Sequence, residues 1–225
     1  MRYVGKLKQL NGKRIISFEV DEDVDIRELQ RFSNTSTITA EILFSDNRSI
    51  SAVQRKKIFA IFGDIAKWSG FFPREIEDLM KYQFLSQRGG EWFSMANTDK
   101  TTARLFITFL IDFCIQHGVQ LKTPGYELAE DIGAYIYSCL ARRVCCITGQ
   151  EGAEIHHVEG SRIGMGGNRN KVNNADRFLI PVNNYWHKRL HNEGEERIFN
   201  TFHIYGIKVD VPTLKALGLK AEDIT

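Results

Sequence analysis

Four of the six histidines of this chain lie in two short segments, and their spacing constrains the fold more than any other feature. His187 and His191 are four residues apart, so in an α-helix their imidazole rings project from the same face. His156 and His157 are neighbours in a short apolar segment typical of a strand, where adjacent side chains point to opposite faces. One member of this pair can therefore join the helical pair on a metal ion, while its neighbour can accept a proton.

The spacing of the histidines alone leaves two simpler interpretations open. The cluster could form a closed zinc site that only stabilises the fold. The histidines could also be ordinary surface or core residues whose ring nitrogens form hydrogen bonds. A single H-x-x-x-H helix is a weak signal, but its combination with an upstream His-His pair favours a metal site.

Length, composition and charge limit the classes of protein to which the chain can belong. Its 225 residues, 43% of them hydrophobic, can form one large domain or two of ordinary size. The formal net charge of +2 excludes a polycation that binds nucleic acid by charge alone, so any nucleic-acid contact must be local. The candidate basic residues are Arg55, Lys56 and Lys57 in the first half, and Arg162, Arg169, Lys171, Arg177, Lys188 and Arg189 around the histidines.

The N-terminus and the cysteines favour a cytoplasmic protein. No apolar segment approaches the roughly 20 residues that a membrane span needs, and the first residues lack the apolar region of a secretory signal. The chain has four cysteines, of which Cys145 and Cys146 are adjacent rather than spaced as a disulfide framework. We therefore expect reduced thiols and no membrane partner.

Strands are expected at the start of the chain. Residues 3–10 and 14–20 flank the dipeptide Asn11-Gly12, which favours the tight turn of a β-hairpin. A short helix over residues 26–32 and a third strand over residues 38–44 are expected to follow.

Helices are expected through most of the remaining chain, because apolar residues recur there at helical spacing. The segment from Leu121 to Gly125 contains proline and glycine and predicts a linker, so we expect domains over residues 1–123 and 124–225. The expected helices cover residues 52–68, 73 to the glycine pair at 89 and 90, 99–117, 127–143, the segment with His187 and His191, 195–202 and 211–217.

The order of elements between Cys146 and His191 resembles a known family. A strand with the two histidines is followed by a loop rich in glycine and asparagine, a short apolar strand over residues 178–182, and the H-x-x-x-H helix. This order resembles the HNH endonucleases of the ββα-metal class, and most closely their colicin-type arrangement. Together with the N-terminal strands, the resemblance implies an α+β fold: a small antiparallel sheet plus helices, then a C-terminal ββα-metal HNH module.

The resemblance implies a role for each histidine in phosphodiester hydrolysis. His157 corresponds to the general base, while His156, His187 and His191 correspond to the ligands of one divalent metal ion. An all-histidine ligand set suits Zn²⁺, Ni²⁺ or Mn²⁺, although Mg²⁺ or Mn²⁺ could support activity in the cell. The expected products carry 5′-phosphate and 3′-hydroxyl ends.

The sequence departs from the family pattern in two places. Relatives usually have an asparagine just before the second strand, where it braces the loop, whereas this chain has Arg177 and Phe178 there. Many relatives also bind a structural zinc through two C-x-x-C pairs, which this sequence lacks, so we expect its cysteines to be buried packing residues. The candidates to replace the missing asparagine are Asn173, Asn174 and Asp176.

The first half of the chain carries a second resemblance. The segment from Ser51 to Lys57, with Asp64-Ile-Ala, Pro73-Arg-Glu-Ile and Lys81, is similar to phage Orf/NinB-type recombination mediators. Those proteins bind single-stranded and branched DNA and engage single-strand-binding protein. The combination resembles HNH nucleases of phages, which implies a DNA-targeting first half, a homodimer, and a place in the cytoplasm of a bacterial host.

Three functions are compatible with these patterns. The favoured one is a DNA endonuclease that acts on single-stranded or branched DNA in phage recombination or replication. The second is a non-catalytic recombination mediator that binds DNA and single-strand-binding protein, which the displaced asparagine keeps open. The third is an RNA-cleaving HNH nuclease, because a core that recognises the phosphate backbone does not itself choose DNA over RNA.

Overall fold

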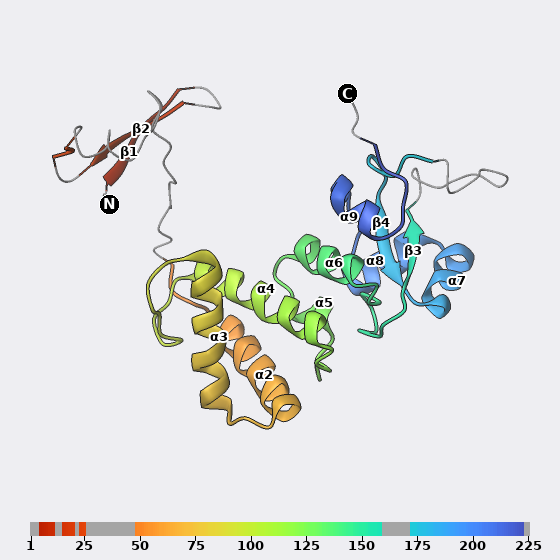
Figure 1. The fold of residues 1–225 in the computed structure, drawn as a ribbon, viewed down its shortest axis with the longest axis horizontal. Helices are drawn as coiled ribbons and strands as arrows, with labels where there is room; N and C mark the ends of the chain where they lie inside the picture. The colour runs from red at the N-terminus through yellow and green to blue at the C-terminus, as the bar shows by residue number, and fades with distance from the viewer. Residues whose placement is uncertain (1–4, 12–14, 21–22, 26–47, 159–171, 223–225) are drawn as a thin grey trace. The chain divides into compact units, whose positions relative to one another are not determined.

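The computed structural model describes residues 5–11, 15–20, 23–25, 48–158 and 172–222 (Figure 1). The chain divides into two compact units, Met1–Ser45 and Asp46–Thr225. The described elements combine helices with two small antiparallel sheets, so the expected α+β class is confirmed. Among the described residues, no helix is long and apolar enough to span a bilayer.

The first unit contains a β-hairpin. Strands β1 (Gly5–Asn11) and β2 (Ile15–Val20) pair antiparallel, which confirms the strands expected on either side of the Asn11-Gly12 signal. The helix expected over residues 26–32 and the strand expected over residues 38–44 lie outside the described residues.

Three long helices open the second unit (Figure 1). They are α2 (Ala52–Ser69), α3 (Pro73–Arg88) and α4 (Lys100–His117), in the segments where the sequence predicted helices. Each of the three helices contacts the other two, so they pack together as one group.

Local signals explain where α2 begins and ends. The Ser51 side chain accepts a hydrogen bond from the backbone N–H of Gln54, and the Gln54 side chain accepts one from the N–H of Ser51. This reciprocal capping box satisfies two donors that a helix start otherwise leaves unpaired. Gly70 then ends the helix with a φ of 81°, a left-handed conformation that glycine adopts without strain.

Phe106 on α4 is the centre of an aromatic core. Its side chain is fully buried, and its ring centroid lies 5.9 Å from that of Phe62 on α2, 5.2 Å from Phe84 on α3 and 5.3 Å from Phe93. The rings meet edge to face, the arrangement that their quadrupoles favour. One residue therefore joins all three helices.

Replacing Phe106 by alanine is expected to lower the free energy of unfolding by about 3–5 kcal/mol, because it removes these contacts and leaves a cavity. Phe72→Ala is the matched control, since 76% of the Phe72 side chain is exposed. Urea denaturation of both variants measures the difference. Equal destabilisation by the two substitutions would contradict this account of the core.

Two short helices connect this group to the site. The sequence predicted one helix over residues 127–143. The structure confirms a helix in this segment, α6 (Ile132–Ala141), but it begins later than predicted and follows a separate short helix, α5 (Gly125–Leu128). The break occurs where Asp131 caps α6 by accepting a hydrogen bond from the N–H of Ala134. The domain boundary expected at residues 123 and 124 lies inside the second unit, and a division of function there stays a prediction.

A second small sheet and the remaining helices complete the described fold. Strand β3 (Glu154–His157) pairs antiparallel with β4 (Leu179–Val182), and α7 (Asn184–Glu193) follows and contacts both strands. Helices α8 (Glu195–Phe202) and α9 (Val211–Ala216) come next. The strands and helices occupy the segments in which the sequence predicted them.

All four cysteines are buried thiols and none forms a disulfide. Burial raises the pKa of Cys139 to about 12, so that thiol stays neutral at pH 7. Cys145 and Cys146 are fully buried in the core beside the second sheet. The expectation that the cysteines are packing residues is confirmed.

Candidate active site

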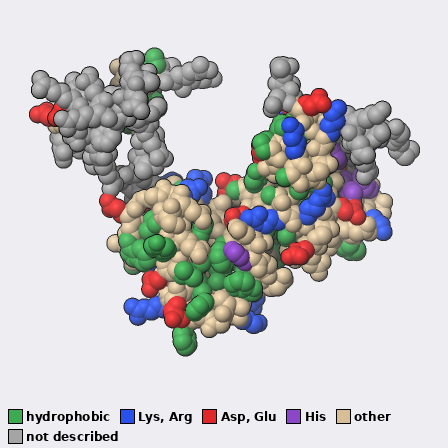
Figure 2. Space-filling view, in the orientation of Figure 1, with side chains coloured by type: hydrophobic (Ala, Val, Ile, Leu, Met, Phe, Trp, Pro, Cys, Tyr) green, Lys and Arg blue, Asp and Glu red, His purple; other side chains and the backbone are tan. Residues whose placement is uncertain are grey.

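Three histidines from β3 and α7 lie together. The ring centroid of His156 is 5.0 Å from that of His187 and 4.9 Å from that of His191, and the two α7 rings are 5.0 Å apart. One ring nitrogen from each residue lies within 4.8 Å of the other two. Histidine side chains gather on the part of the surface formed by these elements (Figure 2). The cluster can hold a metal ion.

His156 has the environment of a metal ligand. Its side chain is 1% exposed, and its Nε2 lies 2.9 Å from a carboxylate oxygen of Glu195. Among the described residues, its Nδ1 is the one buried side-chain nitrogen or oxygen that has no hydrogen-bond partner. Burial lowers the pKa of His156 to about 4, although Glu195 acts in the opposite direction, so the ring is neutral at pH 7. A neutral ring is the form that binds metal ions.

His187 is oriented by Glu154. Its Nδ1 donates a hydrogen bond to the Glu154 carboxylate, and this bond lowers the pKa of Glu154. Glu154 precedes His156 by two residues on β3, so both side chains point to the face that α7 covers. With Nδ1 protonated, the lone pair of the neutral His187 ring lies on Nε2, as a metal ligand requires.

His157 points to the other face of β3 and contacts Asn174. Its Nε2 lies 2.8 Å from Oδ1 of Asn174, whose side chain is buried. The Asn174 Nδ2 donates to the carbonyls of Val172 and Lys220, at 3.0 and 2.9 Å, which fixes the orientation of the amide. Because Oδ1 can only accept, His157 Nε2–H is assigned as the donor. The lone pair of the neutral ring then lies on Nδ1.

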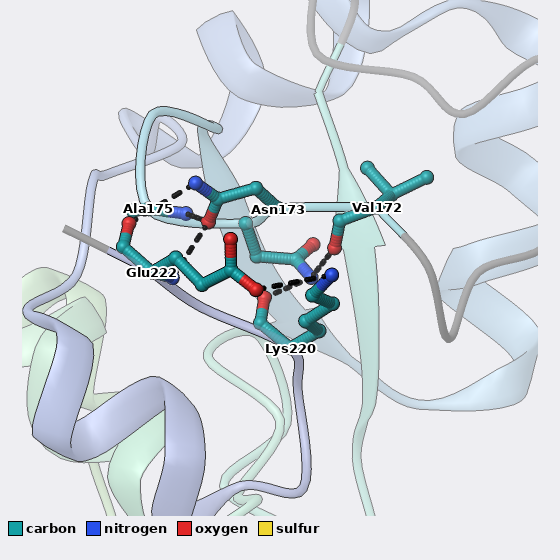
Figure 3. A network of polar contacts seen from close by, with 6 residues as sticks. Val172, Asn173, Ala175, Lys220 and Glu222 are labelled. Carbon is teal, nitrogen blue, oxygen red and sulfur yellow. Dashed lines mark hydrogen bonds and ion pairs between the residues drawn. The ribbon is translucent and has the colours of Figure 1, made fainter. Parts of the chain in front are cut away.

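The three candidates for the bracing residue differ in their contacts. Asn174 is the one that reaches His157. Asn173 binds the C-terminal segment, because its side chain bonds both the N–H and the carbonyl of Glu222 (Figure 3). Asp176 forms an ion pair with Lys208.

A family model described as "Putative HNHc nuclease" matches residues 19–221, which include all four site histidines and Asn174. The chain belongs to this family. No curated protein and no solved structure matches the chain. The resemblance to HNH nucleases is thus confirmed at the level of the family, while the resemblance of the first half to phage recombination mediators stays a prediction.

The basic residues of the first half differ in their contacts and exposure. Arg55 donates to the carbonyls of Met95 and Ala96, at 2.8 and 3.1 Å, and so holds the loop before α4. Lys56 is exposed and Lys57 is half-buried. A nucleic-acid contact on α2 would therefore fall to the two lysines.

The basic residues of the second half also separate into groups. Arg177 donates to the carbonyl of Asn173, and Arg189 pairs with Glu193 while its guanidinium lies 4.6 Å from the Trp186 ring. Lys188 is exposed on α7 beside His187. The other three candidates, Arg162, Arg169 and Lys171, lie outside the described residues.

Two carboxylates of the site were missed in the sequence. Glu154 carried a usable signal, because residues two apart on a strand share a face and Glu154 stands two before His156. Glu195 carried no comparable signal, since its contact with His156 depends on how α8 turns back after Gly194. Both glutamates bind the ring nitrogen of a histidine in the cluster, which is how carboxylates orient metal ligands.

Changing Glu195 to glutamine is expected to weaken Zn²⁺ binding about 10-fold, because it removes the charge that orients His156 while keeping the side-chain shape. Glu196→Gln is the control, since Glu196 neighbours Glu195 but is exposed. Isothermal titration of each metal-free protein with Zn²⁺ gives the affinities. An unchanged affinity in the Glu195 variant would show that this carboxylate does not support the metal site.

Proposed function

We propose that the protein is a metal-dependent DNA endonuclease with His157 as its general base. One observation carries the proposal: Asn174 fixes the ring of His157 on the strand whose neighbouring residue, His156, belongs to a cluster able to hold a metal ion. The match to the HNHc nuclease family supports the reaction class.

His156, His187 and His191 would hold one divalent ion. Three protein ligands leave coordination positions for water and substrate, as in catalytic rather than structural zinc sites. Imidazole nitrogens suit Zn²⁺, Ni²⁺ or Mn²⁺, and Mg²⁺ or Mn²⁺ are the ions to test for activity. When bound, the ion supplies positive charge beside the phosphate and the departing 3′ oxygen.

His157 would take the proton of the attacking water on Nδ1. The water oxygen forms a bond to phosphorus while the bond from phosphorus to the 3′ oxygen breaks, so the products carry 5′-phosphate and 3′-hydroxyl ends. The 3′ oxygen takes its proton from solvent. An ordinary imidazole has a pKa of about 6.5, which suits proton transfer near neutral pH. Asn174 supports this role, because its Oδ1 accepts from Nε2–H in the neutral and the protonated ring alike.

We propose single-stranded or branched DNA as the substrate, in phage recombination or replication in the cytoplasm of a bacterial host. Residues 1–123 would find the DNA, with Lys56 and Lys57 as contacts, and residues 124–225 would cut it. Single-strand-binding protein and a second copy of the chain are the proposed partners. The support is the similarity of residues 51–57 to recombination mediators and the exposure of Lys56.

The contact between Asn174 and His157 favours the enzyme over the non-catalytic mediator. That alternative depended on the absence of an asparagine just before the second strand. Asn174 lies earlier in the loop, yet its buried side chain reaches the proposed base.

A substrate panel tests the proposal. The protein is incubated with labelled single-stranded, duplex, flapped and three-way DNA and with RNA, in Mn²⁺, Mg²⁺, Zn²⁺ or EDTA. We expect metal-dependent cuts in single-stranded or branched DNA and none in EDTA. Tight binding to branched DNA without cutting would support the mediator instead, and a preference for RNA would support the RNA-cleaving alternative.

A further inference from the structure

The segment after α9 returns to the loop before β4 and bonds to it through its main chain (Figure 3). The carbonyl of Lys220 accepts two hydrogen bonds from Asn174, one from its backbone N–H and one from its Nδ2, each 2.9 Å long. Two residues later, the N–H and carbonyl of Glu222 bond the side chain of Asn173 at 3.1 and 3.0 Å. We call residues 220–222 the C-terminal clasp.

The clasp is held by the body of the second unit. Ala221, between the two bonded residues, is 3% exposed and belongs to the hydrophobic core. Upstream, the Leu219 N–H bonds the carbonyl of Leu214 at 2.9 Å, and the Arg143 side chain donates to the carbonyl of Leu217 at 2.7 Å. These contacts fix the path of the chain up to the clasp.

The clasp also helps to orient the amide of Asn174. An asparagine amide can be turned over, which exchanges its oxygen and nitrogen. Neither the carbonyl of Lys220 nor that of Val172 can donate, so together they select the orientation in which Nδ2 faces the two carbonyls and Oδ1 faces His157. Oδ1 in turn selects the His157 ring that is protonated on Nε2. The carbonyl of Lys220 is thus two hydrogen bonds away from the proposed base.

We propose that the C-terminal clasp is a positioning element of the active site, which holds His157 in its Nε2-protonated form through Asn174. The effect on cleavage rests on the proposed nuclease function, but the effect on the His157 ring does not. The three residues act through their main chain and through the buried methyl group of Ala221.

Two shortened proteins and one point variant test the clasp. A protein of residues 1–219 lacks the clasp, while a protein of residues 1–222 keeps it and is the matched control. Asn173→Ala is made in the protein of residues 1–225 and removes the side-chain bonds to Glu222, together with the bond that Asn173 accepts from the N–H of Ala175. We expect the 1–219 protein to cut DNA about 10- to 100-fold more slowly than the 1–222 protein. The loss should lie in kcat and not in KM. The cleavage rate of Asn173→Ala should lie between those of the two shortened proteins. Binding of Zn²⁺ alone should be unchanged in all three.

The ¹⁵N NMR signals of the His157 ring supply a readout that does not depend on cleavage. In the protein of residues 1–225 and in the 1–222 protein we expect the Nε2-protonated ring. In the 1–219 protein and in Asn173→Ala we expect a shift toward a mixture of the two neutral forms. If the His157 signals were the same in all four proteins, the proposed role of the clasp would be contradicted, even if cleavage became slower. If the protein of residues 1–225 cuts no substrate, the nuclease proposal fails, but the His157 signals still test whether the clasp positions the ring.

Discussion

Replacing His157 by alanine is expected to slow DNA cleavage by about 10²- to 10⁴-fold, the usual contribution of a general base. His157 faces away from the three-histidine cluster and contacts Asn174, so its loss removes the proton acceptor without removing a ligand. Single-turnover rates on labelled single-stranded DNA in Mn²⁺ measure the effect. Titration with Zn²⁺ should give the wild-type affinity.

His117→Ala is the matched control, because it makes the same substitution at an exposed histidine at the end of α4. Cleavage by this control should proceed at the wild-type rate. A His157→Ala protein that also cuts at the wild-type rate would show that another group takes the proton. A His157→Ala protein that no longer binds Zn²⁺ would place His157 among the ligands instead.

Replacing His187 or His191 by alanine is expected to remove tight Zn²⁺ binding and Mn²⁺-dependent cleavage together. Each change leaves two ligand nitrogens where three lie within 4.8 Å of one another. Because binding and cleavage fall together, these variants differ from His157→Ala, in which only cleavage falls. Isothermal titration with Zn²⁺ and the single-turnover assay measure the two quantities on the same preparations.

Asn192→Ala is the control for both ligand variants, since Asn192 is an exposed residue of the same helix. It should keep the Zn²⁺ affinity and the cleavage rate of the wild type. If His187→Ala and His191→Ala bind Zn²⁺ as tightly as this control, the metal lies elsewhere in the chain.

The parts of the site that depend on local geometry could be predicted from the sequence. The spacing of His187 and His191 places two rings on one helix face, and alternation along a strand sends His156 and His157 to opposite faces. Both rules hold wherever such elements form, so they predicted that one histidine of the strand pair could join the two helical histidines. The resemblance to HNH endonucleases implied that this histidine is His156. The capping and stop signals of the long helices are local in the same sense.

The parts of the site that depend on the path of loops could not be predicted. Three polar residues in one loop were equal candidates to brace it. Asn174 is held by the carbonyl of Val172 in its own loop and by that of Lys220, 46 residues later in the chain. The contact of Glu195 with His156 depends on the turn between α7 and α8. Asp131 caps the start of α6, in a segment that the sequence predicted to be one continuous helix.

Cleavage in water enriched in ¹⁸O tests the central claim most directly. If His157 activates water to attack phosphorus and the three histidines hold the required metal, mass spectrometry should find one ¹⁸O atom on the new 5′-phosphate. The label should appear with Mn²⁺ and be absent with EDTA, and the His157→Ala protein should form the labelled product about 10²- to 10⁴-fold more slowly. Products with 3′-phosphate or cyclic phosphate ends, or labelled products that form equally in EDTA, would contradict the proposed reaction.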